Sequence, residues 1–385
     1  MPIKSKIVIE TGERLNKKQW ILGLVVLAAL VGLFFWGRQR FHFDFHVFRE
    51  QIAQADWTKM AIGTACIYFA YIFRSIRWAR LLKHNKHVPP LSLVGTQVMG
   101  FTAIALIGRV ADPVRPYLVS KKTGLPLGSQ LAVYIVERLF DAGSMALIFS
   151  VAMLWIPEAE IARATSYSKL VVTMARHSPL LATLFARYGG LAFTLLGALF
   201  LVSVRLWGAE VATFFERTFG LVSKKLGTAV GEKIRTFHSG LDTMRTFSEF
   251  AATAALSVGM WVMIALSYFL TCQAFRGSPE LASISPPKCV LLMIASGGAS
   301  IFQLPVLGWF TQIGIVAAAI TGLFGASTEA STACATSLLL VTFLSVIPVG
   351  LIWAQFEHVS LRKVTHESEV AEEVAVDQPA TNAAE

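Results

Sequence analysis

Six ionisable residues gather between positions 109 and 141, bordered by segments that are apolar enough to cross a bilayer. An ionisable group at the centre of a membrane helix costs roughly 2.5–3.5 kcal/mol on insertion scales, so a chain that keeps several there usually uses them. Guanidinium groups pair with phosphate through two parallel hydrogen bonds, which makes recognition of an anionic headgroup the chemistry to consider. The six residues are Arg109, Asp112, Arg115, Glu137, Arg138 and Asp141.

The first three of these residues follow Gly108 at intervals of three. If the chain is helical after this glycine, Asp112 and Arg115 share a face, and Pro113 is tolerated only near the helix start. Two guanidinium groups beside a helix N-terminus would form an anion site, so Arg109 and Arg115 are candidate ligands of a lipid headgroup. Alternatively, both arginines reach to the membrane interface and pair with local carboxylates such as Asp112.

The other three residues belong to one apolar segment. Glu137 and Asp141 are four positions apart and share a helix face, and Arg138 reaches Asp141 at a spacing of three. This face must point into a helix bundle rather than at lipid. In one interpretation the two carboxylates hold Arg109 and Arg115 until a phosphate competes for them. In the other, they form a structural ion-pair network that fixes the helix register.

A second basic run extends over residues 74–86, with five basic residues and no acid. Within it, Arg74, Arg77 and Trp78 occur at helical spacing. We expect this run to lie on the cytoplasmic surface, where the attraction of anionic lipid contributes about 1 kcal/mol of binding free energy per basic residue. A simple role in setting the topology explains the same residues equally well.

The composition indicates the kind of protein that carries these residues. With 55% hydrophobic and 15% charged residues, the chain is too apolar for a soluble globular protein. The net charge of +10 does not indicate nucleic-acid binding, because the basic residues stand at the ends of apolar segments and form no stripe with aromatic residues. The cysteines show no C-x-x-C spacing, and we expect buried thiols, no metal site and no cofactor. They are Cys66, Cys272, Cys289 and Cys334.

We therefore expect an all-α, polytopic membrane protein with about six full spans. The candidate spans are residues 20–36, 60–73, 131–156, 180–206, 251–275 and 333–353. The basic residues of the connections place both termini in the cytoplasm. The expected organisation is a cytoplasmic segment (residues 1–19), a transmembrane domain (20–358) with an amphipathic cytoplasmic connection of one or two helices (207–250), and a disordered acidic cytoplasmic tail (359–385).

Two apolar segments do not fit ordinary spans. Residues 91–107 are apolar, whereas residues 108–120 are too short and too charged to cross the bilayer, and the lysines that follow belong in the cytoplasm. A helical hairpin that enters the membrane and turns back at Gly108 satisfies both requirements.

The second half of the chain contains a similar interruption. Residues 290–307 and 310–324 are joined at Gly308 and Trp309, just after Pro305. Interrupted segments in corresponding halves indicate an inverted repeat with a site at the repeat interface, and ordinary kinked spans are the alternative. In the repeat interpretation, the second hairpin lines the site. Its candidate lining residues are Pro305, Gln312 and Gly314.

At these residues the chain resembles a known family. The resemblance is carried by the runs from Arg74 to Trp78, Gly108 to Asp112, Arg115 to Leu118 and Glu137 to Asp141. They are similar to the flippase-like transmembrane region of bacterial lysylphosphatidylglycerol synthases and its stand-alone relatives. The resemblance covers about residues 15–358. It implies a bacterial inner membrane protein that translocates a lipid, or that assists a glycolipid or isoprenoid-lipid pathway.

The chain also departs from the family pattern. The family commonly has glutamate at the position of Asp112, which keeps the charge. In the second half the family has a glycine-rich stretch followed by glutamate, and here Gln312 stands at the acidic position. No proton or cation role can therefore be carried over to this position. We also expect that this chain, without the aminoacyl-transferase domain of the two-part synthases, does not make an aminoacylated lipid by itself.

The leading hypothesis is a membrane protein that binds an anionic or isoprenoid-linked lipid and translocates it between leaflets through a charged cavity between the two hairpins. One alternative is a non-catalytic scaffold or accessory subunit for a lipid-modifying enzyme of a glycolipid, aminoacyl-lipid or hopanoid-type pathway. Another is a membrane-embedded enzyme that uses the same carboxylates, although no familiar nucleophile, zinc, P-loop or dinucleotide motif stands in a usable context. The expected partners are a membrane lipid and such an enzyme.

Overall fold

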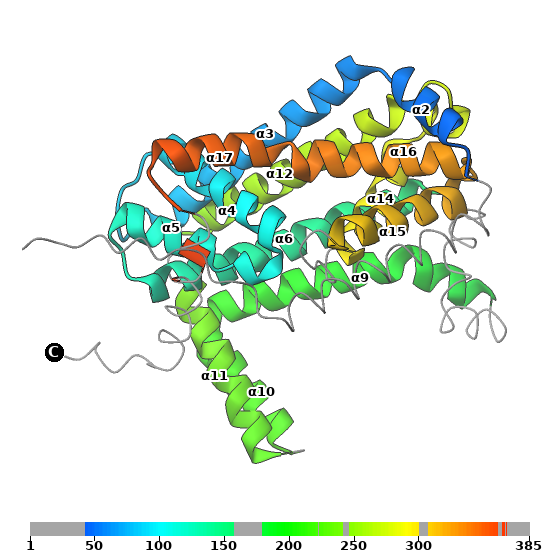
Figure 1. Ribbon diagram of the computed structural model, residues 1–385. Helices are drawn as coiled ribbons and strands as arrows, with labels where there is room; N and C mark the ends of the chain where they lie inside the picture. Colours follow the sequence, from blue (N-terminus) through cyan, green and yellow to red (C-terminus); the bar gives the residue numbers. More distant parts are fainter. Residues whose placement is uncertain are drawn as a thin grey trace, which may run out of the picture. The chain divides into compact units, whose positions relative to one another are not determined.

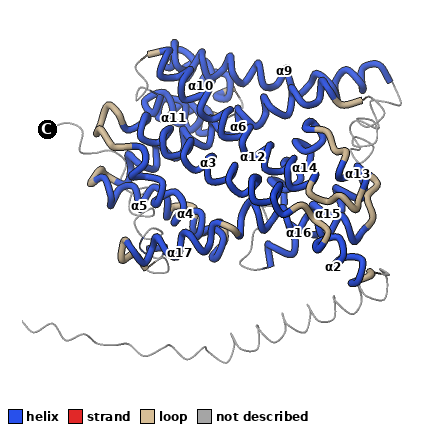
Figure 2. The backbone as a smooth tube through the Cα atoms, turned by 90° about the horizontal axis from the view of Figure 1, so that it is seen from above, coloured by secondary structure: helices blue, strands red, loops and turns tan. Residues whose placement is uncertain are grey.

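The computed structural model describes residues 43–157, 179–221, 223–241, 246–299, 307–360, 364, 365 and 367. The predicted N-terminal segment and the predicted span over residues 20–36 lie outside this part of the chain. The chain divides into residues 1–46 and 47–385, and every helix from α3 onward belongs to the second unit. Throughout the described residues the regular elements are helical (Figures 1 and 2), which confirms the predicted all-α class.

Two long helices form the centre of the bundle. α3 (Trp57–Leu82) packs along α12 (Phe247–Gln273), and Gly63 keeps the two backbones close, because a Cβ there would lie 3.3 Å from the Ser267 carbonyl oxygen. Asp56 caps the start of α3 by accepting hydrogen bonds from the amides of the first turn, and it also pairs with Arg276. These bonds lower the pKa of Asp56 and hold the start of α3 in place.

Two further groups of helices belong to the bundle. α6 (Leu127–Trp155) packs against α9 (Pro179–Leu206), and also against α12. α16 (Thr328–Leu339) continues into a π-helical turn (Leu340–Leu344) and then into α17 (Val346–Phe356), so that one long apolar rod is widened at its middle (Figure 1).

The wider π-helical turn displaces the backbone hydrogen bonds that follow it. The amide of Ser345 donates to the carbonyl of Leu340, five residues earlier, at 2.8 Å. Side chains from two other helices then occupy nearby carbonyl groups. Tyr68 Oη donates to the Ser345 oxygen at 3.0 Å, and Thr102 Oγ1 donates to the Val346 oxygen at 3.2 Å. The rod is therefore fastened to α3 and to the helix that contains Thr102 at the point where it is irregular.

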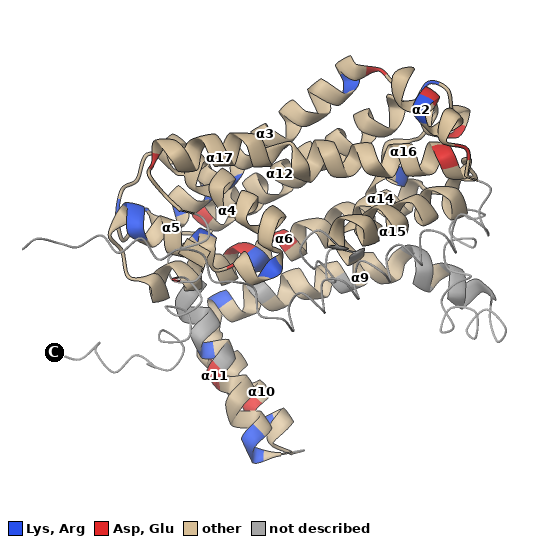
Figure 3. Cartoon of the chain, viewed as in Figure 1, with Lys and Arg blue, Asp and Glu red and all other residues tan. Residues whose placement is uncertain are grey.

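Length and composition mark four helical segments in the described chain as able to cross a membrane: Pro90–Ile107, Tyr188–Leu206, Phe247–Gln273 and Thr328–Phe356. Three of them coincide with predicted spans. The predicted span over residues 60–73 lies within α3, and the one over residues 131–156 lies within α6 except for its last residue; both helices are long enough but also carry buried charges. Figure 3 shows uncharged ribbon over most of α12, α16 and α17. The number of six spans stays a prediction.

The first hairpin turns where the sequence predicted. α4 (Val94–Ile107) ends at Gly108, which adopts φ 94° and ψ −168°, and a 3₁₀ turn (Arg109–Ala111) leads into α5 (Val114–Thr123), which packs back on α4. Only glycine adopts this backbone region readily. The break at Gly108 is therefore a property of the local sequence.

The second hairpin is helical at the predicted break. α14 (Pro286–Ala299) and α15 (Leu307–Phe324) pack together, and Gly308 and Trp309 lie inside the first turn of α15. The predicted break at these two residues is wrong. One glycine lowers helix propensity by only about 1 kcal/mol, which tertiary contacts override. Residues 300–306, and with them Pro305, lie outside the described residues.

The turn at Gly108 gives a first testable prediction. Gly108→Ala should lower the free energy of unfolding by about 1–3 kcal/mol, because alanine must occupy a glycine-only conformation. Thermal unfolding of the detergent-solubilised protein measures the change. The matched control is Gly143→Ala in the middle of α6, where a Cβ meets open space and higher helix propensity should stabilise by up to about 1 kcal/mol. Equal midpoints for the two variants would show that the turn is not constrained.

The connection predicted over residues 207–250 contains two helices that pack on each other. α10 (Gly208–Gly220) and α11 (Lys224–Leu241) meet closely at Gly227, and the pair extends away from the other helices (Figure 1). Its exposed side chains include large apolar ones such as Phe214 and Leu221. The amphipathic character agrees with the sequence, and the position on the inner leaflet stays a prediction.

The predicted disorder of residues 359–385 is wrong at the few positions that the structure describes. Val364 and Thr365 are buried, and Val364 packs in an apolar cluster with residues of α4 and α5. Glu367 accepts hydrogen bonds from Tyr117 Oη at 2.6 Å and from Lys121 Nζ at 2.8 Å, which raises the pKa of Lys121. The average composition of the tail conceals the buried position of Val364.

Candidate functional site

Glu137 of α6 is the centre of a buried ion-pair cluster. The shortest contacts join Arg77 Nη2 to Glu137 Oε1 at 2.6 Å, and Arg115 Nη2 to both Glu137 oxygens at 2.9 Å. The Glu137 side chain is 1% exposed, so these pairs form away from bulk water. Four guanidinium groups contact this one carboxylate: those of Arg74 and Arg77 from α3, Arg115 from α5 and Arg138 from α6.

Asp141, one helical turn further along α6, extends the cluster. Its carboxylate lies 2.6 Å from Arg77 Nη1, 2.8 Å from Arg138 Nη2 and 3.5 Å from Arg74 Nη1. Arg77 also donates to Ser257 Oγ of α12 at 2.7 Å. Four arginines thus share two carboxylates, an excess of two positive charges. Unbalanced charge that is buried inside a protein lowers its stability, and an anionic ligand would reduce this loss.

Arg115 is held by side chains of three other helices, α3, α4 and α6. Gln97 Oε1 of α4 accepts hydrogen bonds from Arg115 Nε at 3.0 Å and from Nη2 at 2.6 Å. The guanidinium carbon lies 4.6 Å from the centre of the Phe101 ring and 5.3 Å from that of Trp78. Gly100 leaves the space that the Arg115 side chain occupies, since a Cβ there would collide with it. Nε and Nη2 of this guanidinium group therefore have hydrogen-bond partners, and its carbon lies near aromatic rings.

The predicted surface position of Arg74, Arg77 and Trp78 is wrong. α3 continues to Leu82, and these residues are 7%, 1% and 1% exposed. The Trp78 indole donates to Gln130 Oε1 at 3.0 Å instead of contacting lipid headgroups. The number of basic residues in the run does not show which side of a helix each residue is on. Arg74 and Arg77 are on the side that faces α6 and pair with its acids, whereas Arg80 is on the other side and is exposed.

The burial of these three residues could have been predicted from the spacing of α3. The buried stripe of α3 contains Ile67, Ala70 and Tyr71, and its spacing of three and four continues to Arg74, Arg77 and Trp78. A helical apolar stripe that runs into arginines predicts buried arginines when a neighbouring segment supplies carboxylates.

A cavity of about 310 Å³ lies beside this cluster and is called the chamber below. Tyr134, apolar side chains and four charged residues of the first half line it, and Ser296, Gly297 and Gln312 of the second hairpin line it as well. The two hairpins also touch, because Trp309 Nε1 at the start of α15 donates to the Ala105 oxygen near the end of α4 at 3.2 Å. The charged residues that line it are Arg74, Arg109, Asp112 and Arg138.

The chamber brings some of the predicted site residues together and leaves others out. Gln312 lines it, as predicted, and Arg109 lines it too, while its contact with a headgroup stays a prediction. Arg115 is 1% exposed and is not among the lining residues, which argues against its predicted direct contact with a headgroup. Arg138, whose side chain is 40% exposed, stands at the wall. Gly314 is exposed and does not line the chamber, which corrects that prediction as well.

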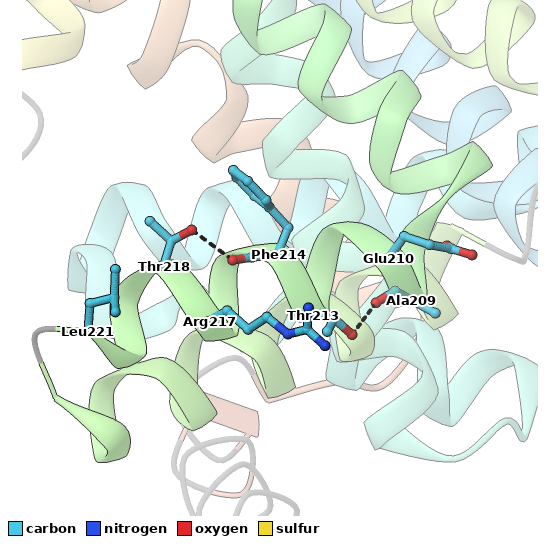
Figure 4. A pocket seen from close by; sticks show the side chains of 7 residues that line it. All are labelled: Ala209, Glu210, Thr213, Phe214, Arg217, Thr218 and Leu221. Carbon is cyan, nitrogen blue, oxygen red and sulfur yellow. Dashed lines mark hydrogen bonds between the residues drawn. The ribbon is translucent and has the colours of Figure 1, made fainter.

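A larger hollow of about 640 Å³ lies along α10 (Figure 4). One stretch of helix supplies all its lining residues, from Ala209 to Leu221. Thr213 and Thr218 donate their hydroxyls to carbonyls of the preceding turn, at 2.8 Å each. Its hydroxyl groups are thus already occupied, and we prefer the smaller chamber, where charged groups from several helices converge.

Metal chemistry finds no support in the part of the chain that the structure describes, where no three histidine, cysteine or acidic residues are grouped to hold an ion. The four cysteines are free and buried.

Comparison with known proteins gave one result. The family model described as the lysylphosphatidylglycerol synthase TM region matches residues 20–354. No curated protein and no solved structure matched the chain. The matched range contains both hairpins, the ion-pair cluster and all residues that line the chamber.

Proposed function

The chain belongs to the family of the lysylphosphatidylglycerol synthase transmembrane region, membrane proteins of lipid-related pathways, and we propose that its chamber binds the anionic headgroup of a lipid and moves it between leaflets. The observation that carries this proposal is an excess of positive charge at the wall of a cavity lined by both hairpins. Phosphate is the group common to phospholipids and isoprenoid phosphates, and it is the ligand we propose for this charge.

The wall offers suitable partners for phosphate. Three arginines and one acid line the chamber, namely Arg74, Arg109, Arg138 and Asp112. A guanidinium group presents paired donors that match two phosphate oxygens. Behind the wall, Arg77 and Arg115 form the closest ion pairs with Glu137. The arginines that line the chamber are therefore compensated less completely by carboxylates. A bound phosphate would supply the charge that the cluster lacks.

Translocation also requires that the chamber open in turn to the two leaflets. The two hairpins are discontinuous helices that meet at the hydrogen bond from Trp309 to Ala105. Transporter sites lie between such interrupted helices, and rocking of one half against the other gives alternating access. We propose that separation of the two hairpins opens the chamber, while the ion pairs of α3, α5 and α6 keep the charged side together.

The enzymatic alternative is supported less well. Glu137 and Asp141 are each paired with several arginines, and a carboxylate held in this way is a weak base and has no proton to donate. The scaffold alternative needs no chamber, and it predicts an unchanged lipid distribution between leaflets. The bacterial inner membrane and the cytoplasmic termini stay predictions.

The proposal predicts a specific effect of Arg138→Gln. In vesicles reconstituted with the purified protein, this variant should slow the transfer of a fluorescent phosphatidylglycerol between leaflets by about tenfold or more, a loss of ~1.4 kcal/mol of transition-state stabilisation. Chemical quenching of the outer leaflet measures the rate. Arg276→Gln is the matched control, because it removes an exposed arginine that pairs with Asp56. Equal rates for wild type and both variants would contradict the proposal.

A further inference from the structure

The helices α10 and α11 expose large apolar side chains although they pack closely on each other. A Cβ on Gly227 of α11 would collide with the Glu216 carbonyl oxygen, so this side of α10 is covered. Phe214 stands two positions from Glu216 and therefore lies on the opposite side of the helix. Leu221, seven positions further on, shares the face of Phe214, and the two side chains are 63% and 89% exposed. Large apolar side chains that share an exposed face mark an interaction surface.

This face continues the outer surface of the preceding helix. The apolar stretch Tyr188–Leu206 of α9 is long enough to cross a membrane, and hardly any of it is buried. A membrane-spanning helix of this kind has its side chains in contact with acyl chains. A hollow of about 420 Å³ is lined by Leu196 and Leu199 of α9 together with Phe214 and Phe215 of α10. Lipid that covers α9 therefore reaches α10 as well.

Basic residues stand on the same face and at the end of the helix pair. Arg217 and Leu221 line the hollow shown in Figure 4, and Glu210 is the one acid among its lining residues. Lys224 and Lys225 begin α11 and are exposed. None of these three basic side chains pairs with an acid in the part of the chain that the structure describes. Basic residues beside exposed apolar ones are typical of helices that lie on an anionic membrane surface.

We propose that α10 and α11 form an arm that docks on the anionic surface of the membrane that the protein spans. Phe214 and Leu221 enter the outer part of the acyl-chain layer, and the basic residues bind lipid phosphates. The continuity with the lipid-facing side of α9 favours a lipid surface over a partner protein as the cover of this face. None of the arm's described residues lines the chamber, so this contact is separate from it and does not require that the chamber moves lipid.

A fluorophore on either side of the arm tests which side the membrane covers. Thr218 is exposed on the proposed face. Ala229 is exposed on α11 and, about half a turn from Gly227, lies on the far side of the arm. The full chain with Thr218→Cys or Ala229→Cys is labelled with a nitrobenzoxadiazole group, and wild type, whose four cysteines are buried, is the blank. In vesicles that contain phosphatidylglycerol, nitroxide-bearing lipid should quench the label at position 218, and aqueous acrylamide should quench the label at position 229.

Further variants of the chain labelled at position 218 separate charge from apolar contact. Arg217→Gln together with Lys224→Gln should lower the ratio of lipid-quenched to acrylamide-quenched label by about fivefold per residue, and wild type in pure phosphatidylcholine should show a similar loss. Arg235→Gln, which removes an exposed arginine that already pairs with Glu216, should leave the ratio unchanged. Phe214→Ser should expose the label to acrylamide in vesicles of either composition.

Two results would overturn the inference. Equal quenching by acrylamide at positions 218 and 229 in vesicles with phosphatidylglycerol would show that the membrane does not cover this face, and a partner protein would then be the remaining cover. Wild-type quenching in the variant that lacks Arg217 and Lys224 would show that anionic lipid is not what the arm binds. Neither result bears on the proposed function, because no transfer of lipid is measured.

Discussion

Replacing Glu137 with glutamine should destabilise this protein by about 3–5 kcal/mol, the usual cost of removing one partner from a buried ion pair. The carboxylate contacts four guanidinium groups, and three of them belong to side chains that are no more than 8% exposed. In the variant, Asp141 alone would balance them. Thermal or denaturant unfolding in detergent measures the loss.

Two further variants separate charge from shape in this experiment. Glu357→Gln removes a partly exposed carboxylate that pairs with Lys122, and it should cost no more than about 1 kcal/mol. Adding Arg115→Met to Glu137→Gln removes one uncompensated cation, so the double variant should regain stability, with a coupling of about 0.5–3 kcal/mol. Purely additive losses would contradict an ion-pair cluster as the source of the effect.

Filling the chamber without altering its charge should abolish transfer of lipid. Gly297 of α14 lines the chamber, and a Cβ at this position meets no atom within 4 Å. Gly297→Trp should therefore place an indole in the space that a headgroup would use. We expect at least a tenfold slower transfer of fluorescent phosphatidylglycerol in vesicles, ~1.4 kcal/mol or more, with little change in the thermal midpoint.

Gly314→Trp provides the matched control. Gly314 of α15 also has open space around its Cβ, but it does not line the chamber. Both substitutions raise helix propensity alike, so a difference between their transfer rates reports on the chamber. Wild-type transfer by Gly297→Trp, or equal loss in both variants, would show that lipid takes another path.

Local rules explain which parts of this fold were predictable. The apolar lengths of the spans, the inward face of Glu137 and Asp141, and the turn at Gly108 each depend on residues that are close in sequence. The spacing of Glu137 and Asp141 excludes a lipid-facing position whatever the rest of the chain does. A break at a glycine with positive φ is likewise set by the backbone at that residue.

Pairing across the bundle was not predictable in the same way. Arg77 meets Glu137 and Asp141 although about sixty positions separate them, and only the packing of α3 against α6 and α12 brings these groups together. The same holds for the positions of Arg115 and Arg138 relative to the chamber. Spacing shows that both are near the carboxylates, whereas Gln97 and the aromatic rings decide that Arg115 lies behind the wall.

In the second hairpin, the prediction from sequence failed for a different reason. Gly308 and Trp309 resemble a break in the sequence, yet the indole of Trp309 bonds to α4, and this long-range contact accompanies a helical start at Leu307. The acid expected from the family at position 312 is a glutamine, whose amide bonds to Ser296. The absence of an acid at position 312 was visible in the sequence, whereas the cavity that Gln312 lines together with three arginines required the structure.

The most direct test is an experimental density map of the purified protein in a bilayer of phosphatidylglycerol. We expect a phosphate within hydrogen-bonding distance of the Arg138 guanidinium group, in a chamber lined by Arg74 and Gln312. A map in which the side chains of the two hairpins close this space, and in which every ordered phosphate lies on the outer surface of the bundle, would contradict it.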